Sequence, residues 1–574
     1  KFWDKNQITL FSIFLLPIAL IIKLLFLFKR SIGRNHQCSI PVICVGNIYL
    51  GGTGKTPLCI EIFSILKDLQ KNPAFIRKQY NFSQDETSLQ KSVGPVYQNK
   101  NRIDAIEEAK KNNANVAILD DRFLAVGDLG DLSASNEMDL KGRTVCPGFV
   151  DSHTHDDKIL FSDPLMTCKV SQGVTTVVTG NCGISLAPLK LKKPPPSPLD
   201  LLVANESDFF ENFETYFSKI EKEPPSLNAL CQVGHTTLRV SSMDSYDRIA
   251  SNSEILKMQK LLDKSLDSGA FGMSTGLFYS PAISAQTSEV IELARVLKEH
   301  GALHTTHMRD EGENIEESLR ETFLIGMEAK IPVVISHHKC SGEINYGRSK
   351  ETLTLIDQAS RFQNIGLDAY PYNASSTVLS AYSKYQTEKV LVTWSDTMPE
   401  FAGEELSEIA EKLGVSMNEA VEALCPGGGI FFTMDEEDVR RILSYPKTMI
   451  GSDGLPSDTH PHPRLWGTFP RVLGHYVRDV KLFSLEEAVR KMTSLPAEFF
   501  GLKNRGIIRP GNYADLVIFD SEKIIDTATF ENPISNAEGI DQVMVNGRIV
   551  WNEGEHTGER PGKILRLQDL SPLH

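Results

Sequence analysis

Cysteine is scarce in this chain of 574 residues: its nine cysteines are scattered, without the density or regular spacing of a disulfide-stabilised secreted domain. We therefore expect reduced thiols and a cytoplasmic protein. An excess of positive charge is also lacking, since the net charge is -14 and the pI is near 5.6. No basic stripe follows residue 40. This balance argues against nucleic acid as a partner, because the phosphate backbone is neutralised by clustered Lys and Arg.

One long apolar run lies at the start of the chain, from Ile8 to Phe28, with basic residues on both sides. It is long enough to cross a bilayer, but Pro17 and Lys23 interrupt it. A signal peptide is disfavoured because no small-residue cleavage site follows. We predict a helix attached to the cytoplasmic face of the inner membrane, with contact through residues 8–34. A buried core helix is the alternative, less favoured because the run is apolar on all faces.

A glycine-rich loop follows, between a predicted strand, IPVICVGN, and a predicted helix, PLCIEIFSILKDL. Strand, loop and helix in this order are typical of a P-loop, with Lys55 on the nucleotide phosphates and Thr56 on magnesium. The pattern therefore predicts a site for ATP and Mg²⁺ in residues 1–120. Its residues are Gly51, Gly52, Thr53, Gly54, Lys55 and Thr56.

The pattern changes after residue 121, as expected for a chain too long for one domain. Between 151 and 501, short apolar strands alternate with helical stretches, which favours a (β/α)8 barrel with an insertion at about 380–441. Shorter, alternating strands with glycine turns predict a small β-sandwich from residues 121–150 and 502–574. The whole chain is thus predicted to be α/β, with a partial P-loop segment ahead of the barrel.

Potential metal ligands recur at the carboxyl ends of the predicted barrel strands, where such barrels collect their chemistry. One residue separates His153 from His155, so both imidazoles lie on one face of a strand. Imidazole and thiolate together favour zinc over magnesium or calcium. Each residue alone would more often be structural, but that reading does not explain six suitable groups at successive strand ends. The six are His153, His155, Cys182, His307, His337 and Asp453.

Longer motifs surround these residues from about residue 121 to the end of the chain. They include CPGFVDSHTHDD, QGVTTVVTGNCGISLAPL, STGLFYSPA, HMRDEG, SHHK, YPYNASST, GSDGLP and HPHPRLWGTFPRVLG. This region resembles the D-aminoacylases of the amidohydrolase superfamily. The resemblance implies zinc-dependent hydrolysis of N-acyl-D-amino acids to a carboxylate and a free D-amino acid.

The same resemblance assigns the metal ligands and the base. It implies one tightly held zinc on Cys182, His307 and His337. A weaker second position would use His153, His155, Cys182 and Asp453, with Cys182 as the bridge. Bound metal lowers the pKa of its water to about 7, and Asp453 would act as the general base.

Substrate contacts are likewise implied by the resemblance. Tyr279 would stabilise the oxyanion that forms on the scissile carbonyl. The α-carboxylate of the substrate would bind Lys339, Tyr370 and Ser376. An apolar pocket for the D-side chain would include Phe278 and Met434, although either is equally compatible with simple core.

Residues 1 to about 121 resemble the tetraacyldisaccharide 4'-kinases of lipid A biosynthesis, through VGNIYLGGTGKTP, the pair Asp85 and Glu86, and ILDD. The kinase resemblance stops at Asp121, without the half that carries the lipid site in that family. The deacylase-like region retains only the last strand of its usual opening. We therefore expect kinase activity to be lost.

Three alternatives stay open. Another amidohydrolase reaction, by a dipeptidase or a cyclic amidase, would use the same metal site with different pocket residues. The P-loop segment favours a membrane-associated, ATP-dependent lipid kinase. A fusion of two incomplete parts that has neither activity is the third.

Overall fold

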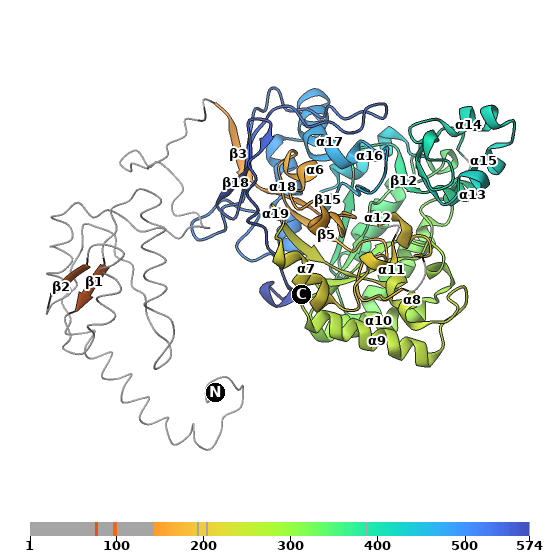
Figure 1. Ribbon diagram of the computed structural model, residues 1–574, viewed down its shortest axis with the longest axis horizontal. Helices are drawn as coiled ribbons and strands as arrows, with labels where there is room; N and C mark the ends of the chain where they lie inside the picture. Colours follow the sequence, from red (N-terminus) through yellow and green to blue (C-terminus); the bar gives the residue numbers. More distant parts are fainter. Residues whose placement is uncertain are drawn as a thin grey trace, which may run out of the picture. The chain divides into compact units, whose positions relative to one another are not determined.

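The computed structural model describes residues 142–191, 194–202, 205–385 and 387–572, Leu140, and two short strands nearer the start (Figure 1). The chain divides into two compact units, residues 1–120 with 130–138 and residues 121–129 with 139–574. In the first unit, strands β1 (Phe75–Lys78) and β2 (Val96–Asn99) pair in parallel, as an α/β segment requires.

Several predictions for the first unit lie outside the described residues. They are the apolar run and its basic flank at 8–34, the P-loop at 51–56, and the acidic residues of the kinase resemblance. In the part of the chain that the structure describes, no helix is long and apolar enough to cross a membrane.

The second unit is built around parallel strands in two sheets, three in one and six in the other. In sheet order, the first sheet contains β4 (Phe149–Asp151), β5 (Val174–Thr179) and β6 (Asn228–Cys231). The second contains β7 (Val233–Gly234), β8 (Gly272–Gly276), β9 (Leu303–His307), β10 (Val333–Ile335), β11 (Ile365–Ala369) and β15 (Thr448–Ile450).

The two sheets form a barrel-like ring with eight strand positions. Gln232 alone separates β6 from β7, so these two strands occupy one position. On the other side, Ser152 N donates to Ile450 O at 3.2 Å and Asp453 N donates to His153 O at 2.8 Å, which joins β4 to the end of β15. The predicted alternation of strands and helices is confirmed, although the described strands form two arcs rather than one closed sheet.

Helices follow most of these strands and cover them, as Figure 1 shows for α9 and α10. Helix α9 begins at a capping box made by Ser251 and Glu254, and it buries Met258, Leu262 and Leu266 at helical spacing. The main helices are α7 (Phe213–Lys222), α8 (His235–Ser242), α9 (Asn252–Asp267), α10 (Thr287–His300), α11 (Ile315–Ala329), α12 (Ser349–Ala359), α16 (Glu436–Ser444) and α18 (Leu485–Met492). The others are α17 (Arg464–Arg471) and the shorter α5 (Ile159–Ser162), α6 (Thr167–Val170) and α19 (Ser494–Phe499).

Apolar side chains fill the amino-terminal end of the ring. Phe271 precedes β8, Leu303 begins β9, and Phe500 follows α19, and all three belong to one buried cluster. The other strands contribute Val150, Val178, Leu230, Val334 and Met449 to it. With this end packed, polar side chains collect at the carboxyl ends of the strands, as in (β/α)8 enzymes.

The C-terminal strands form an antiparallel sheet of five strands, β19-β18-β17-β16-β3. They are β3 (Thr144–Pro147), β16 (Leu516–Phe519), β17 (Ile540–Val545), β18 (Arg548–Asn552) and β19 (Glu555–His556). Cys146 lies opposite Val517, so β3 supplies the edge strand beside β16. A sandwich is predicted for this region, and its described residues form one sheet.

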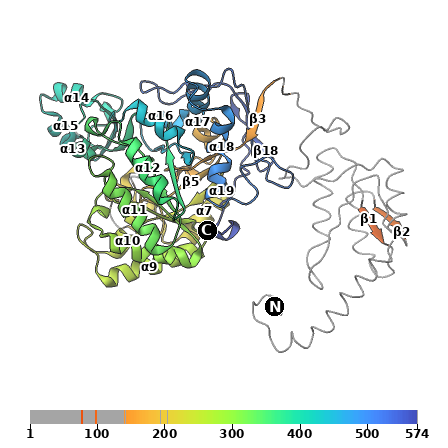
Figure 2. The same ribbon diagram turned by 180° about the vertical axis from the view of Figure 1, so that it is seen from behind.

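A separate subdomain lies between β11 and β15. It contains β12 (Ser375–Val378), β13 (Val390–Ser395), β14 (Gly427–Phe431), α13 (Tyr382–Tyr385), α14 (Leu406–Leu413) and α15 (Met417–Leu424). The expected bounds, 380–441, miss β12 and include part of α16, which packs on α12 as a barrel helix. Its helices lie at the opposite end of the second unit from β3 and β18 (Figures 1 and 2).

A buried ion-pair network connects the first and last strands of the ring. The Lys169 ammonium on α6 is fully buried and donates to Asp151 Oδ2 at 2.9 Å and to Ser452 Oγ at 2.7 Å. Asp156 Oδ2 lies 3.5 Å from the same nitrogen. Ser452 N also donates to Asp151 Oδ1 at 2.8 Å, so the network ties β4 to the segment after β15.

Lys169→Met should lower the free energy of unfolding by about 3–5 kcal/mol, because it leaves two buried carboxylates without their cation. Lys190→Met is the matched control: Lys190 pairs with Glu211 at the surface, where a salt bridge contributes about 0–1 kcal/mol. Urea unfolding of both variants and the wild type measures the difference. Equal losses in the two variants would show that the buried network does not stabilise the ring.

Candidate metal centre

Six potential ligands converge at the carboxyl ends of the strands. His153 and His155 follow β4, and Cys182 follows β5. The remaining three are His307 at the end of β9, His337 after β10 and Asp453 after β15. All six side chains are buried. The structure therefore brings together the six residues that the strand-end pattern selects.

The short distances centre on Cys182 and Asp453. Cys182 Sγ lies 3.3 Å from Nε2 of His153 and 3.3 Å from Nε2 of His337. Asp453 Oδ1 lies 3.2 Å from Nε2 of His155 and 3.4 Å from Nε2 of His153. Two groups result, each with one ligand atom per residue and all such atoms within 4.8 Å of one another: His153, His155, Cys182 and Asp453, and Cys182, His307 and His337.

The chemistry of this donor set fits zinc. Both ring nitrogens of the buried His307 have no hydrogen-bond partner among the described residues, and a role as a metal ligand explains this. Burial by itself raises the pKa of the Cys182 thiol, but His153 and His337 outweigh this effect and hold that pKa well below its usual range. Thiolate sulfur and imidazole nitrogen are ligand atoms that zinc prefers.

Three of these residues adopt a left-handed backbone conformation. The φ angles are 51° at Cys182, 36° at His337 and 50° at Asp453. Such a conformation costs on the order of 1–3 kcal/mol for a residue other than glycine, and it persists where the surrounding structure requires it. Strain at three strand ends therefore marks the same edge of the ring as the ligand distances.

Buried carboxylates orient the histidines. Asp368 Oδ1 accepts a hydrogen bond from His337 N at 2.7 Å and lies 3.2 Å from His153 Nδ1. Glu311 Oε1 lies 3.0 Å from His337 Nδ1, while Nε2 of that ring faces Cys182. Partners of this kind fix the tautomer and the orientation of a metal-binding histidine.

Asp453 is held from its other side by an arginine. Arg464 Nη1 lies 2.9 Å from Asp453 Oδ2, and both side chains are buried. Burial alone raises the pKa of Asp453, but Arg464, His153 and His337 outweigh it and keep the pKa well below the usual range. Asp453 is therefore a carboxylate with one oxygen toward the ligand group and the other on Arg464.

A cavity of about 420 Å³ opens on this group, and it is lined by residues from both halves of the ring. Tyr279, Lys339 and Ser376 line it, as the predicted substrate contacts would. The Tyr279 hydroxyl lies 2.7 Å from Thr377 Oγ1, and burial raises its pKa well above the usual range. The buried Ser376 hydroxyl has no hydrogen-bond partner among the described residues.

Lys339 is already paired within the protein. Its ammonium donates to Glu311 at 2.7 Å and lies 2.8 Å from His337 Nδ1. Tyr370 does not line this cavity directly; its ring lies 4.5 Å from the Arg464 guanidinium and 5.9 Å from Lys339 Nζ. Of the three predicted contacts for a carboxylate, Lys339 and Ser376 therefore line this cavity, whereas Tyr370 lines the neighbouring one.

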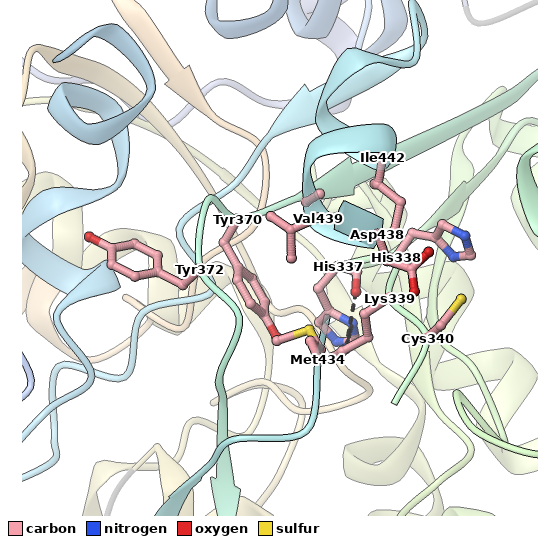
Figure 3. A pocket seen from close by; sticks show the side chains of 11 residues that line it. His337, His338, Lys339, Cys340, Tyr370, Tyr372, Met434, Asp438, Val439 and Ile442 are labelled. Carbon is pink, nitrogen blue, oxygen red and sulfur yellow. Dashed lines mark hydrogen bonds between the residues drawn. The ribbon is translucent and has the colours of Figure 1, made fainter. Parts of the chain in front are cut away.

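A neighbouring cavity of about 300 Å³ receives Met434, together with Tyr370, Val439 and Ile442 (Figure 3). Lys339 lies between the two cavities and lines both. The Phe278 ring packs beside the metal cavity: it stacks on Tyr385, a lining residue, with 5.7 Å between centroids. The two residues of the predicted side-chain pocket thus lie in different places rather than in one pocket.

Sequence reasoning assigns no role to several residues of this site. Asp368, Glu311, Arg464 and Tyr385 make the contacts described above. Glu311 and Arg464 lie within the motifs HMRDEG and HPHPRLWG, and this position in a motif is the sequence signal that could identify them. Asp368 is inside an apolar strand, where a carboxylate that needs a buried partner is itself a signal.

A ring of parallel strands with His, Cys and Asp ligand groups at its carboxyl edge defines a metal-dependent hydrolase of the barrel type. The chain belongs to the amidohydrolase family, whose model matches residues 136–413 and 417–551. It is a hydrolase that acts on carbon–nitrogen amide bonds.

Relatives of known activity cover most of this region. D-aminoacylase of Alcaligenes xylosoxydans xylosoxydans is 52% identical over 452 residues, which is 79% of this chain and 93% of the relative. N-acyl-D-aspartate deacylase of the same organism is 48% identical over 460 residues, 80% of this chain and 92% of the relative.

Solved structures agree with this family. A crystal structure of D-aminoacylase is similar with a TM-score of 0.77 and 54% identity, over 79% of this chain and 95% of that one. N-acyl-D-glutamate deacylase of Bordetella bronchiseptica was solved with zinc and a phosphonate inhibitor. It is similar with a TM-score of 0.75 and 42% identity, over 78% of this chain and 94% of that one.

The start of the chain matches a second family. Residues 11–124 match the tetraacyldisaccharide-1-P 4'-kinase model. The kinase of Pelagibacter ubique is 42% identical over 121 residues, which is 21% of this chain and 38% of that kinase. The chain therefore spans well under half of this relative, in agreement with the kinase-like segment predicted for residues 1 to about 121.

Cys182→Ala should lower zinc affinity by more than the about 10–100-fold that follows loss of an outer partner, because Cys182 belongs to both ligand groups. Cys231→Ala is the matched control. Cys231 is buried in β6 and belongs to neither ligand group. Burial raises its pKa to about 12, so it remains a protonated thiol. Zinc per chain after dialysis measures the effect. Equal zinc content in the two variants would remove Cys182 from the ligand set.

Proposed function

We propose that this chain uses zinc to hydrolyse the amide bond of N-acyl-D-amino acids, releasing a carboxylate and a free D-amino acid. One observation carries the proposal: both metal-ligand groups share a cavity with Lys339 and with the Ser376 hydroxyl, which no other residue of the described part of the chain engages in a hydrogen bond. A cation and a hydroxyl beside a hydrolytic metal suit an amide substrate that carries a carboxylate. The activities of the relatives support the same substrate class.

Zinc, when bound, lowers the pKa of its water to about 7 and polarises a carbonyl oxygen. The tight position would be Cys182, His307 and His337, and the weaker one His153, His155, Cys182 and Asp453. In D-aminoacylase the binuclear centre is described by one-metal activation and second-metal attenuation, which supports unequal positions here.

Asp453 is proposed as the general base. Arg464 holds Oδ2, so Oδ1 is the oxygen that faces the ligand group and accepts the proton lost by the attacking water. The low pKa keeps Asp453 ionised and able to accept it. Asp453 then delivers the proton to the nitrogen of the leaving D-amino acid.

Tyr279 is proposed to stabilise the negative charge that develops on the carbonyl oxygen. Its high pKa keeps the phenol protonated, so the hydroxyl remains a donor. Thr377 Oγ1, 2.7 Å away, holds this hydroxyl at the cavity wall.

The α-carboxylate is proposed to bind between Lys339 and Ser376, with Tyr370 supporting them through Arg464. We place the D-side chain toward Phe278, which stacks on the lining residue Tyr385, and toward Met434, which lines the neighbouring cavity that shares Lys339. An apolar side chain matches the ring of Phe278 and the thioether of Met434.

Purified zinc-loaded protein should hydrolyse N-acetyl-D-methionine and not its L-enantiomer, and a chelator should abolish turnover until zinc is restored. Asp453→Asn is the matched variant: turnover should fall by at least about 100-fold, since proton transfer contributes about 10²–10⁴-fold, while the zinc on Cys182, His307 and His337 is retained. Amine release measures turnover. Hydrolysis of dipeptides or cyclic amides alone would replace this proposal with another reaction of the family.

The kinase-like segment is proposed to lack lipid kinase turnover, even where Lys55 and Thr56 bind nucleotide. Phosphoryl transfer depends on positioning both substrates, and the segment matches only a minor part of such a kinase. Labelled ATP with a tetraacyldisaccharide 1-phosphate should therefore give no more product with the wild type than with Lys55→Ala. Product above that control would show an active kinase.

A further inference from the structure

The metal cavity has two chemically different walls. On one side, Lys339 follows β10, and Ser375 and Ser376 lie on β12, just after β11. On the other side, Ile184, Pro198 and Leu201 follow β5. Leu455 follows β15, which lies between β11 and β4 in the ring. In the eight-position ring, β5 and β10 are four positions apart, so these two strand ends face each other across the cavity.

The apolar wall is a joined structure rather than a chance group of side chains. Ile184, Leu201 and Leu455 are each at most 5% exposed. Ser457 Oγ donates to Leu202 O at 2.9 Å, which ties the loop after β15 to the loop that carries Leu201. The two loops are therefore tied together, and Ile184, Leu201 and Leu455 belong to one buried apolar cluster.

The connectivity of the substrate decides which part meets which wall. An amide bond is planar and trans, so the acyl chain and the α-carbon point in opposite directions from it. The carboxylate and the side chain share the α-carbon, so both stay on the side of Lys339. The acyl chain then extends toward the opposite wall.

We propose that Ile184, Pro198, Leu201 and Leu455 form the acyl-binding surface and set the acyl group that is accepted: an uncharged aliphatic chain. This inference rests on the proposed function, since it assumes the orientation given by the α-carboxylate. Lys339 is the one Lys or Arg among the described residues that line the cavity, and it lies on the opposite wall. A charged acyl group would meet apolar side chains without a partner, which is costly.

The test compares Leu201→Ala with Leu202→Ala in zinc-loaded protein. Leu202 is the matched control, because it is the next residue, equally apolar and buried, but does not line the cavity. Substrates are the N-acetyl, N-butyryl, N-hexanoyl and N-succinyl derivatives of D-methionine, and the N-acetyl derivatives of D-alanine, D-leucine and D-phenylalanine. If Leu201→Ala does not fold, Leu455→Ala enlarges the same apolar wall and replaces it in the test.

Leu201→Ala should raise the ratio of kcat/KM for N-hexanoyl over N-acetyl by at least about tenfold, since each methylene in an apolar pocket is worth about 10-fold or more. The ratios among D-side chains should stay constant, and Leu202→Ala should leave both profiles as in the wild type. N-succinyl should be cleaved far more slowly than N-butyryl.

Two failures are distinguishable. A wild type that cleaves no N-acyl-D-amino acid would overturn the proposed function and this inference together. A wild type that cleaves them, with an acyl ratio unchanged in both Leu201→Ala and Leu455→Ala, or with N-succinyl cleaved as fast as N-butyryl, would overturn the acyl surface alone.

Discussion

The contact of one buried thiolate with imidazoles from two other strands is the constraint on which this site depends. Cys182 Sγ reaches His153 and His337 at 3.3 Å because β5 ends in a left-handed turn. The turn also needs a close approach of β8: a Cβ at Gly276 would lie 2.1 Å from Cys182 O. Only glycine permits that approach, so a residue without a side chain helps to place the shared ligand.

Charge within the buried site is balanced by partners on the same or nearby strand ends. Asp368 contacts His153 Nδ1 and accepts a hydrogen bond from His337 N. Glu311 pairs with Lys339, and Arg464 pairs with Asp453. A buried charge without a partner is costly, and these groups each have a partner that neutralises or orients them. The geometry of the ligands therefore depends on several strand ends together.

Much of this arrangement is predictable from sequence, because it follows from periodicity. Strands that alternate with helices predict the barrel-like ring, and side chains at the strand ends select the six ligands. The supporting residues are not predictable in the same way: Asp368 is one carboxylate inside an apolar strand, and its two partners come after two other strands, β4 and β10. The resemblance places Met434 in the substrate pocket, yet Met434 lines the neighbouring cavity, which shares Lys339 with the metal cavity. The start of the inserted subdomain was missed because SSTV at 375–378 is too polar to indicate a buried strand.

In evolutionary terms, the subdomain between β11 and β15 is a single exchangeable segment. It supplies Ser376, Thr377 and Tyr385 to the cavity, whereas every candidate metal ligand belongs to the ring itself. Its two connections leave and re-enter neighbouring strands, since β11 pairs directly with β15. A recombination event that exchanged this one segment would give a lineage a different lining on this side of the cavity and leave all six candidate metal ligands in place.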